Sequence, residues 1–91
     1  MKMYFHPGRC CMTSGAAALL QEHNKNPAEF IAQHLRLVPG MLDEEDAQAN
    51  IEAVAHGQRV FSKFSVANGQ AVYVITEWDR SVTTILLPDE Y

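Results

Sequence analysis

Residues 59–91 read RVFSKFSVANGQAVYVITEWDRSVTTILLPDEY, the segment of the chain with the clearest β-strand pattern. Two apolar runs flank the pair Asn68-Gly69, which is typical of a tight β-hairpin turn, and a third run follows a polar turn at residues 79–81. The pattern predicts strands at about residues 59–66, 71–77 and 82–87. We therefore expect a three-stranded antiparallel β-meander. Both faces of its middle strand carry apolar residues, which favours a second apolar surface beyond the one that helices cover.

The preceding half carries start and stop signals for helices at about residues 16–23, 27–38 and 44–56. Asn26 caps the second of these, and Asp43 caps the third, because their short side chains accept backbone N–H groups at a helix start. The chain is thus predicted to form one α+β domain, residues 1–91. In this domain, two to three N-terminal helices pack on the C-terminal three-stranded antiparallel β-meander.

Apolar residues at helical spacing predict which helix faces are buried. The stripe of the third helix is expected to comprise Ala47, Ile51, Val54 and Ala55. On the second helix, His34 falls on the apolar stripe between Ile31 and Val38. A hydrogen-bonded core histidine is therefore favoured at this position over a catalytic one.

Charge and length exclude several classes of function. Ninety-one residues, 47% of them hydrophobic, suffice for one modest core, and the formal net charge of −4 disfavours binding to free DNA or RNA. No apolar run has the length of a signal-peptide core or a membrane span. We expect a cytoplasmic protein without membrane association.

The two cysteines, Cys10 and Cys11, are adjacent, so they give no intramolecular disulfide framework. Together with His6 they suggest a soft-metal site, but a structural zinc needs four ligands and a spacing between the cysteines. We therefore expect no metal and no cofactor, and we interpret the thiols as buried or half-buried.

Two surface features are candidates for binding. Residues 43–46 read DEED; they cap the third helix and complement its dipole, and they also make the second half of the chain acidic, which favours a partner with a basic groove. The turn at residues 78–81 reads WDRS and combines two residue types that are enriched at binding hot spots. The sequence leaves open whether Trp78 packs inward or lies exposed. The candidate binding residues are Asp43, Glu44, Glu45, Asp46, Trp78, Asp79 and Arg80.

Three segments carry a family resemblance: GMLDEEDAQAN at residues 40–50, GQRVFS at 57–62 and ITEWDRSVTTILLPDEY at 75–91. They resemble the motifs GxLxEEDxxxN, G-x-R-hydrophobic-hydrophobic-S and ITEADRSxTTILLPEEY. These motifs are typical of a family of small uncharacterised proteins of plasmids, phages and integrated elements, sometimes labelled plasmid-related or restriction-associated. The chain departs from the family at residues 38–40, which read VPG where members commonly have Asp-Trp-Gly, and at Trp78, where members commonly have a small residue. The resemblance implies a mobile-element setting and no catalytic residue.

A looser resemblance is to the BECR superfamily of metal-independent ribonuclease toxins, in which helices precede a curved antiparallel sheet. It implies a catalytic set of His34, Arg59 or Arg80, and Thr83 or Thr84, of which we take His34, Arg80 and Thr84.

The leading prediction is a non-enzymatic protein that binds and modulates a host protein, such as a defence or nucleic-acid enzyme, through its acidic surface. The alternatives are a ribonuclease toxin and a structural homodimer that forms through the outer face of the sheet.

Overall fold

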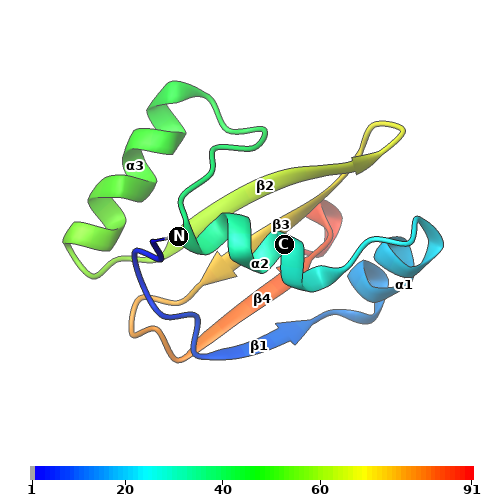
Figure 1. Cartoon of the computed structure of the whole chain (residues 1–91), viewed down its shortest axis with the longest axis horizontal. Helices are drawn as coiled ribbons and strands as arrows, with labels where there is room; N and C mark the ends of the chain where they lie inside the picture. The colour runs from blue at the N-terminus through cyan, green and yellow to red at the C-terminus, as the bar shows by residue number, and fades with distance from the viewer. Residues whose placement is uncertain (1) are drawn as a thin grey trace.

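A four-stranded mixed sheet runs through the molecule, with α1 and α2 across one face and α3 beside the strand β2 (Figure 1). The computed structural model describes residues 2–91. In chain order the elements are β1 (Arg9–Met12), α1 (Ser14–Glu22), α2 (Pro27–Leu35), α3 (Glu44–Ala55), β2 (Val60–Ala67), β3 (Gln70–Thr76), β4 (Val82–Leu86) and the 3-10 helix η1 (Pro88–Glu90). The α+β class is confirmed.

The predicted meander is present as β2, β3 and β4, which pair antiparallel in sequence order. Asn68 and Gly69 have φ values of 51° and 77°, the left-handed values that a two-residue hairpin turn of type I′ requires at both positions. Helix capping by Asn26 and Asp43 also follows the prediction, since each side chain accepts a backbone N–H of the first turn. Thr13 caps α1 in the same way.

The prediction of a three-stranded, purely antiparallel sheet was wrong. β1 pairs in parallel with β4, with Arg9 opposite Val82 and Met12 opposite Ile85, so the strand order is β1-β4-β3-β2. A four-residue strand has too little alternation to be recognised, and its partner lies at the other end of the chain.

The second helix ends at Leu35, earlier than predicted. Leu37 has a φ of 57°, and the Val38 N–H reaches back to the Gln33 carbonyl oxygen, which is the hydrogen bond of a Schellman C-terminal cap. The turn made by Leu37 therefore ends the helix before Pro39 does.

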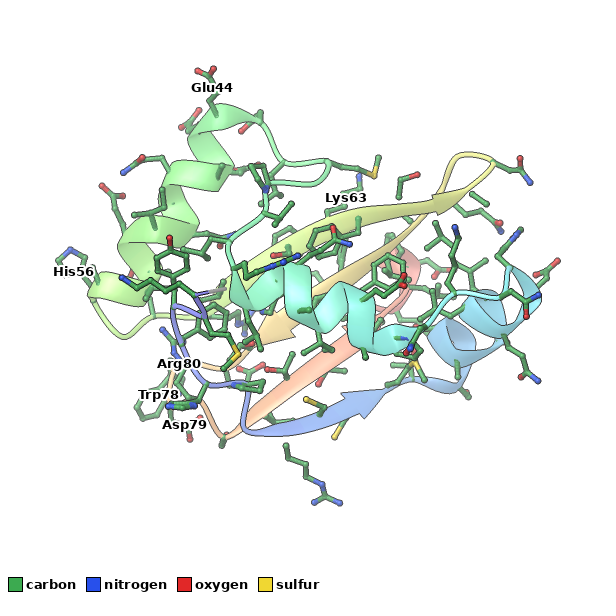
Figure 2. All side chains as sticks on the ribbon, in the orientation of Figure 1. Glu44, His56, Lys63, Trp78, Asp79 and Arg80 are labelled. Carbon is green, nitrogen blue, oxygen red and sulfur yellow. The ribbon has the colours of Figure 1, made fainter. Side chains whose placement is uncertain are left out.

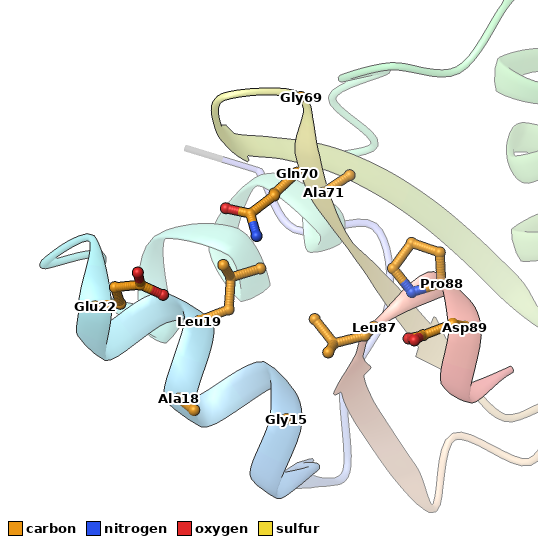
Figure 3. A pocket seen from close by; sticks show the side chains of 10 residues that line it. All are labelled: Gly15, Ala18, Leu19, Glu22, Gly69, Gln70, Ala71, Leu87, Pro88 and Asp89. Atoms are coloured by element: carbon orange, nitrogen blue, oxygen red, sulfur yellow. The ribbon is translucent and has the colours of Figure 1, made fainter.

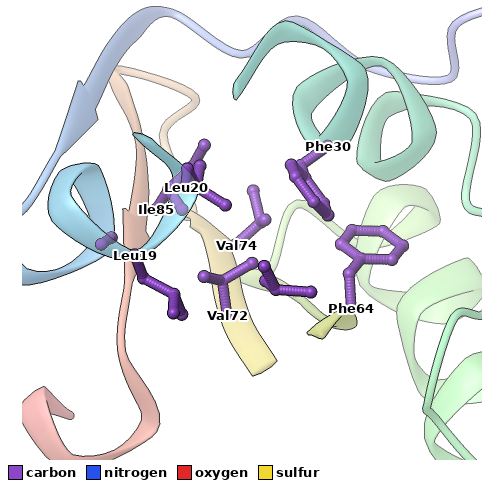
Figure 4. Close-up of a cluster of buried hydrophobic side chains, with 9 residues drawn as sticks. Leu19, Leu20, Phe30, Phe64, Val72, Val74 and Ile85 are labelled. Carbon is purple, nitrogen blue, oxygen red and sulfur yellow. The ribbon is translucent and has the colours of Figure 1, made fainter. Parts of the chain in front are cut away.

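The main core lies between the sheet and the first two helices (Figure 4). Its buried members are Ala16, Leu19, Leu20, Phe30, Phe64, Val66, Val72, Val74 and Ile85. A second cluster, formed by Phe5, Leu35, Ala53 and Val60, joins the N-terminal segment to α2, α3 and the start of β2. The buried face of α3 differs from the predicted stripe: Asn50 and Ala53 are buried, whereas Ile51 is 51% exposed.

On the other face of the sheet, the C-terminus covers part of the apolar surface. The Tyr91 ring packs against Phe61 and Tyr73, at centroid distances of 6.2 and 5.9 Å. Ile75 and Leu86, the cross-strand neighbours of Phe61 and Tyr73, are buried. No helix within residues 2–91 combines the length and the apolar content that crossing a membrane requires.

Candidate functional site

The turn that joins β3 to β4 carries Trp78, an aromatic side chain whose exposed fraction is 67%. Local hydrogen bonds shape this turn. The Arg80 N–H donates to the Glu77 carbonyl oxygen, and Asp79 Oδ1 accepts from both the N–H and the hydroxyl of Ser81, at 3.1 and 2.6 Å. Donation by the Ser81 hydroxyl lowers the pKa of Asp79. The sequence left open whether Trp78 packs inward; the structure places it outward.

Arg80 has a φ of 58°, and its side chain turns back into the molecule. Its Nη1 donates to the carbonyl oxygens of Gln58 and Glu77, at 2.6 and 3.1 Å, and its Nη2 donates to the Ala53 carbonyl oxygen at 3.2 Å. The guanidinium also lies over the Phe5 ring, 5.4 Å from its centroid. Ala53 belongs to the last turn of α3, where a cation meets the negative end of the helix dipole. Arg80 therefore holds the turn in place.

The acidic candidates lie at the other end of α3 (Figure 2). Asp43, Glu44, Glu45 and Asp46 are all exposed, and the Asp43 carboxylate accepts the Asp46 N–H at 2.8 Å. The helix has 12 residues and is therefore about 18 Å long at about 1.5 Å per residue. The predicted binding residues thus form two patches, one near each end of α3.

His34 lies at the centre of a buried polar network. Its Nδ1 is 2.6 Å from Ser62 Oγ and its Nε2 is 2.8 Å from Thr76 Oγ1. Thr76 Oγ1 is in turn 2.6 Å from Thr83 Oγ1, which donates to the Pro7 carbonyl oxygen. The two hydroxyl partners occupy both ring nitrogens of the histidine.

The network links α2, three strands and the N-terminal segment, and its four side chains, His34, Ser62, Thr76 and Thr83, have no exposed surface. Burial, assisted by the positive charge of Arg80, lowers the pKa of His34 to about 4. The imidazole is therefore neutral near pH 7. The expectation of a hydrogen-bonded core histidine agrees with this environment.

The residues proposed for a ribonuclease do not form one site. His34 is buried and hydrogen-bonded to Thr76, which in turn bonds to Thr83. Thr84 lies on the opposite face of β4 from Thr83, because neighbouring side chains of a strand point to opposite faces. The guanidinium of Arg80 is engaged with backbone carbonyl groups. The imidazole itself has no exposed surface in the folded chain.

Cys10 and Cys11 also point to opposite faces, because they are consecutive residues of β1. Cys10 is exposed, so the interpretation of the thiols as buried or half-buried was wrong for Cys10, whereas Cys11 is half-buried. Within residues 2–91 there is no group of three or more histidine, cysteine, aspartate or glutamate side chains placed to hold a metal ion.

A hollow of about 490 Å³ lies between α1, the β2–β3 hairpin and η1 (Figure 3). Small and apolar residues such as Gly15, Ala18 and Leu87 form much of its wall, and Glu22 and Asp89 supply its carboxylates. It holds no nucleophile with an adjacent base, so we assign no chemistry to it.

Sequence reasoning missed the structural part played by Arg80 and the network around His34. Ser62, Thr76 and Thr83 share one face of the predicted strands with apolar residues, and hydroxyl residues in such a row are a recognisable signal of a buried hydrogen-bonded group. No local pattern pairs Arg80 with α3, because the contact depends on how the helix docks.

Comparison with protein-family models, with curated proteins and with solved structures finds no match for this chain.

Proposed function

We propose that this chain is a non-enzymatic protein-binding module of a mobile element, which binds and modulates a host protein, such as a defence or nucleic-acid enzyme. The observation that carries the proposal is Trp78, a large aromatic side chain with an exposed fraction of 67% on a turn held by hydrogen bonds. A rigid, exposed aromatic residue loses little conformational freedom on binding and fills a pocket on the partner. The mobile-element setting rests on the motif resemblance alone.

The acidic residues at the start of α3 support a second contribution to partner binding. Residues 43–91 carry nine Asp and Glu against three Lys and Arg, whereas residues 1–42 carry two against four. Exposed carboxylates at the start of α3 would attract a basic partner surface and accelerate encounter, while Trp78 would supply contact energy. The two patches make different predictions, because charge acts mainly on the association rate and an aromatic contact mainly on the dissociation rate.

Affinity capture of the tagged chain from a bacterial lysate, with nuclease treatment to remove nucleic-acid bridges, tests the proposal. We expect one stoichiometric protein partner. Trp78→Ala should weaken its affinity by roughly 30-fold, the effect of about 2 kcal/mol at a hot spot. Replacing Glu44 and Glu45 by glutamine, with the Asp43 cap kept, should slow association without a comparable change in dissociation.

Met41→Ala is the matched control, because Met41 is also a large apolar side chain and is 50% exposed, but it lies before α3. If Trp78→Ala leaves the partner's affinity unchanged while the variant remains folded, the proposed binding surface is wrong. If expression instead arrests growth and cellular RNA is cleaved, the ribonuclease alternative replaces it, with a catalytic group other than the buried His34.

A further inference from the structure

The two edge strands of the sheet, β2 and β1, differ in whether other parts of the chain bond to their outer backbone groups. On β2, the Asn50 side chain accepts the Phe61 N–H and donates to the Phe61 carbonyl oxygen, and the Met41 N–H donates to the Lys63 carbonyl oxygen. These contacts block further pairing along β2. β1 is the opposite edge of the sheet, and no strand within residues 2–91 pairs with its outer side. An open edge of this kind favours pairing with another chain.

The hydrogen bonds to β4 show which backbone groups of β1 face outward. The Arg9 and Thr13 N–H groups donate to the Ser81 and Ile85 carbonyl oxygens. Since backbone groups of alternate residues face the same side of a strand, those of Cys10 and Met12 point away from the sheet. The outer side of β1 therefore presents two N–H and two C=O groups, those of Cys10 and Met12.

We propose that two copies of this chain associate through antiparallel pairing of their β1 strands about a twofold axis at Cys11, which forms one continuous eight-stranded sheet. In this register, Cys10 of each copy is opposite Met12 of the other and exchanges two hydrogen bonds with it, four in all. The two Cys11 residues then face each other across the axis as a pair without mutual hydrogen bonds, with Cβ atoms about 4.5–5.5 Å apart.

Charge complementarity on one face supports a second copy as the occupant. In the same register, Arg9 is opposite Thr13 of the partner copy, and both side chains lie on the outer face with Cys11. The Thr13 hydroxyl donates to Glu90 Oε1 at 2.7 Å, and the Leu87 N–H donates to the same oxygen. These donors lower the pKa of Glu90, which favours its ionised form. Because Glu90 is bonded to Thr13, the register sets each Arg9 beside a carboxylate of the other copy.

Apolar complementarity on the helix-covered face points to the same arrangement. Met12 is 39% exposed although it belongs to a strand. The pairing would set it beside Cys10 of the other copy, which lines a groove of about 590 Å³ between β1 and α2. Pro27, Ala28 and Ile31 form the apolar wall of that groove. The dimer would therefore cover an exposed methionine on each side of the axis.

This inference does not rest on the proposed function, because it uses neither Trp78 nor the acidic residues at the start of α3. Sedimentation velocity of the full chain under reducing conditions, over a concentration series, should show a monomer–dimer equilibrium.

Arg9→Glu and Glu90→Arg should each weaken dimerisation by about tenfold, since each places like charges together at two symmetric positions. The double variant R9E/E90R should restore it. Lys63→Glu, which changes the net charge by the same amount as Arg9→Glu but lies on β2, should associate like the unmodified chain apart from a small net-charge effect.

A thiol cross-link provides a second measurement. Diamide takes up the two thiol hydrogens as an Sγ–Sγ bond forms, and it should link Cys11 to Cys11 in the wild-type dimer. The link should persist in Cys10→Ser and disappear in Cys11→Ser. A monomer throughout the concentration series, a failure of the double variant to recover, or a cross-link through Cys10 would each overturn the β1 pairing.

Discussion

His34 shows how a single residue makes the fold depend on pH. Both ring nitrogens meet hydroxyl groups of the sheet, and the side chain is removed from water. A protonated imidazole would place an uncompensated charge in this site, close to Arg80. The residue therefore acts as a structural element that requires a neutral ring.

We expect the free energy of unfolding to fall as the pH drops from about 6.5 to about 4. The pKa of His34 is about 4 in the folded chain and 6.5 for the unperturbed group, so the unfolded chain takes up the proton first. The contribution of His34 is complete above pH 6.5, and about 3 kcal/mol is lost by pH 4. Urea unfolding at several pH values measures the slope.

His34→Gln should reduce this slope between pH 7 and 5, whereas His56→Gln, at the exposed C-terminal cap of α3, should preserve it. An NMR titration of the wild-type histidines gives an independent test, which does not depend on the stability of a variant. A His34 signal that titrates near 6.5 would contradict the buried neutral ring.

At the scale of elements, α3 shows where local patterns succeed and where they fail. Its start, its cap and its end near Gly57 follow from Asp43 and the glycine, because these signals act within one helical turn. Its buried face does not follow from apolar spacing. The helix docks through Asn50, whose amide replaces a neighbouring strand for the backbone of Phe61.

Asn50→Ala should destabilise the chain by about 2 kcal/mol, because it leaves the Phe61 N–H and C=O groups without their partner at a part-buried edge. Ile51→Ala should change stability by less than about 0.5 kcal/mol, because that side chain is largely exposed. Chemical denaturation of the two variants compares them directly. Equal losses would support the predicted apolar stripe instead.

At the scale of the whole molecule, Arg80 joins parts of the chain that are far apart in sequence. It contacts the N-terminal segment through Phe5, α3 through Ala53 and the following linker through Gln58. The N-terminal segment passes so close to this turn that a Cβ at Gly8 would collide with the carbonyl oxygens of Arg80 and Ser81. The turn and the N-terminus therefore form one packed unit.

Arg80→Ala should reduce the free energy of unfolding by about 2 kcal/mol or more, because several carbonyl oxygens lose a charged donor. Arg80→Lys should recover only part of the loss, since an ammonium does not span the same carbonyl groups as the planar guanidinium. Trp78→Ala, two residues away, should cost less than about 0.5 kcal/mol. Thermal or urea unfolding distinguishes the three variants, and a neutral Arg80→Ala would contradict the packed unit.

The sequence alone determined the α+β class, the three helices, the β2–β3–β4 meander and the Asn68-Gly69 turn, because each arises from periodicity or from capping and turn residues close in the chain. Tertiary structure alone decided that Arg9 to Met12 form a fourth strand, that Trp78 lies exposed while Arg80 turns inward, and that the acidic residues stand apart from Trp78. These outcomes depend on which distant backbone groups are left to pair and on how much space remains once α3 has docked. No short stretch of residues encodes either quantity.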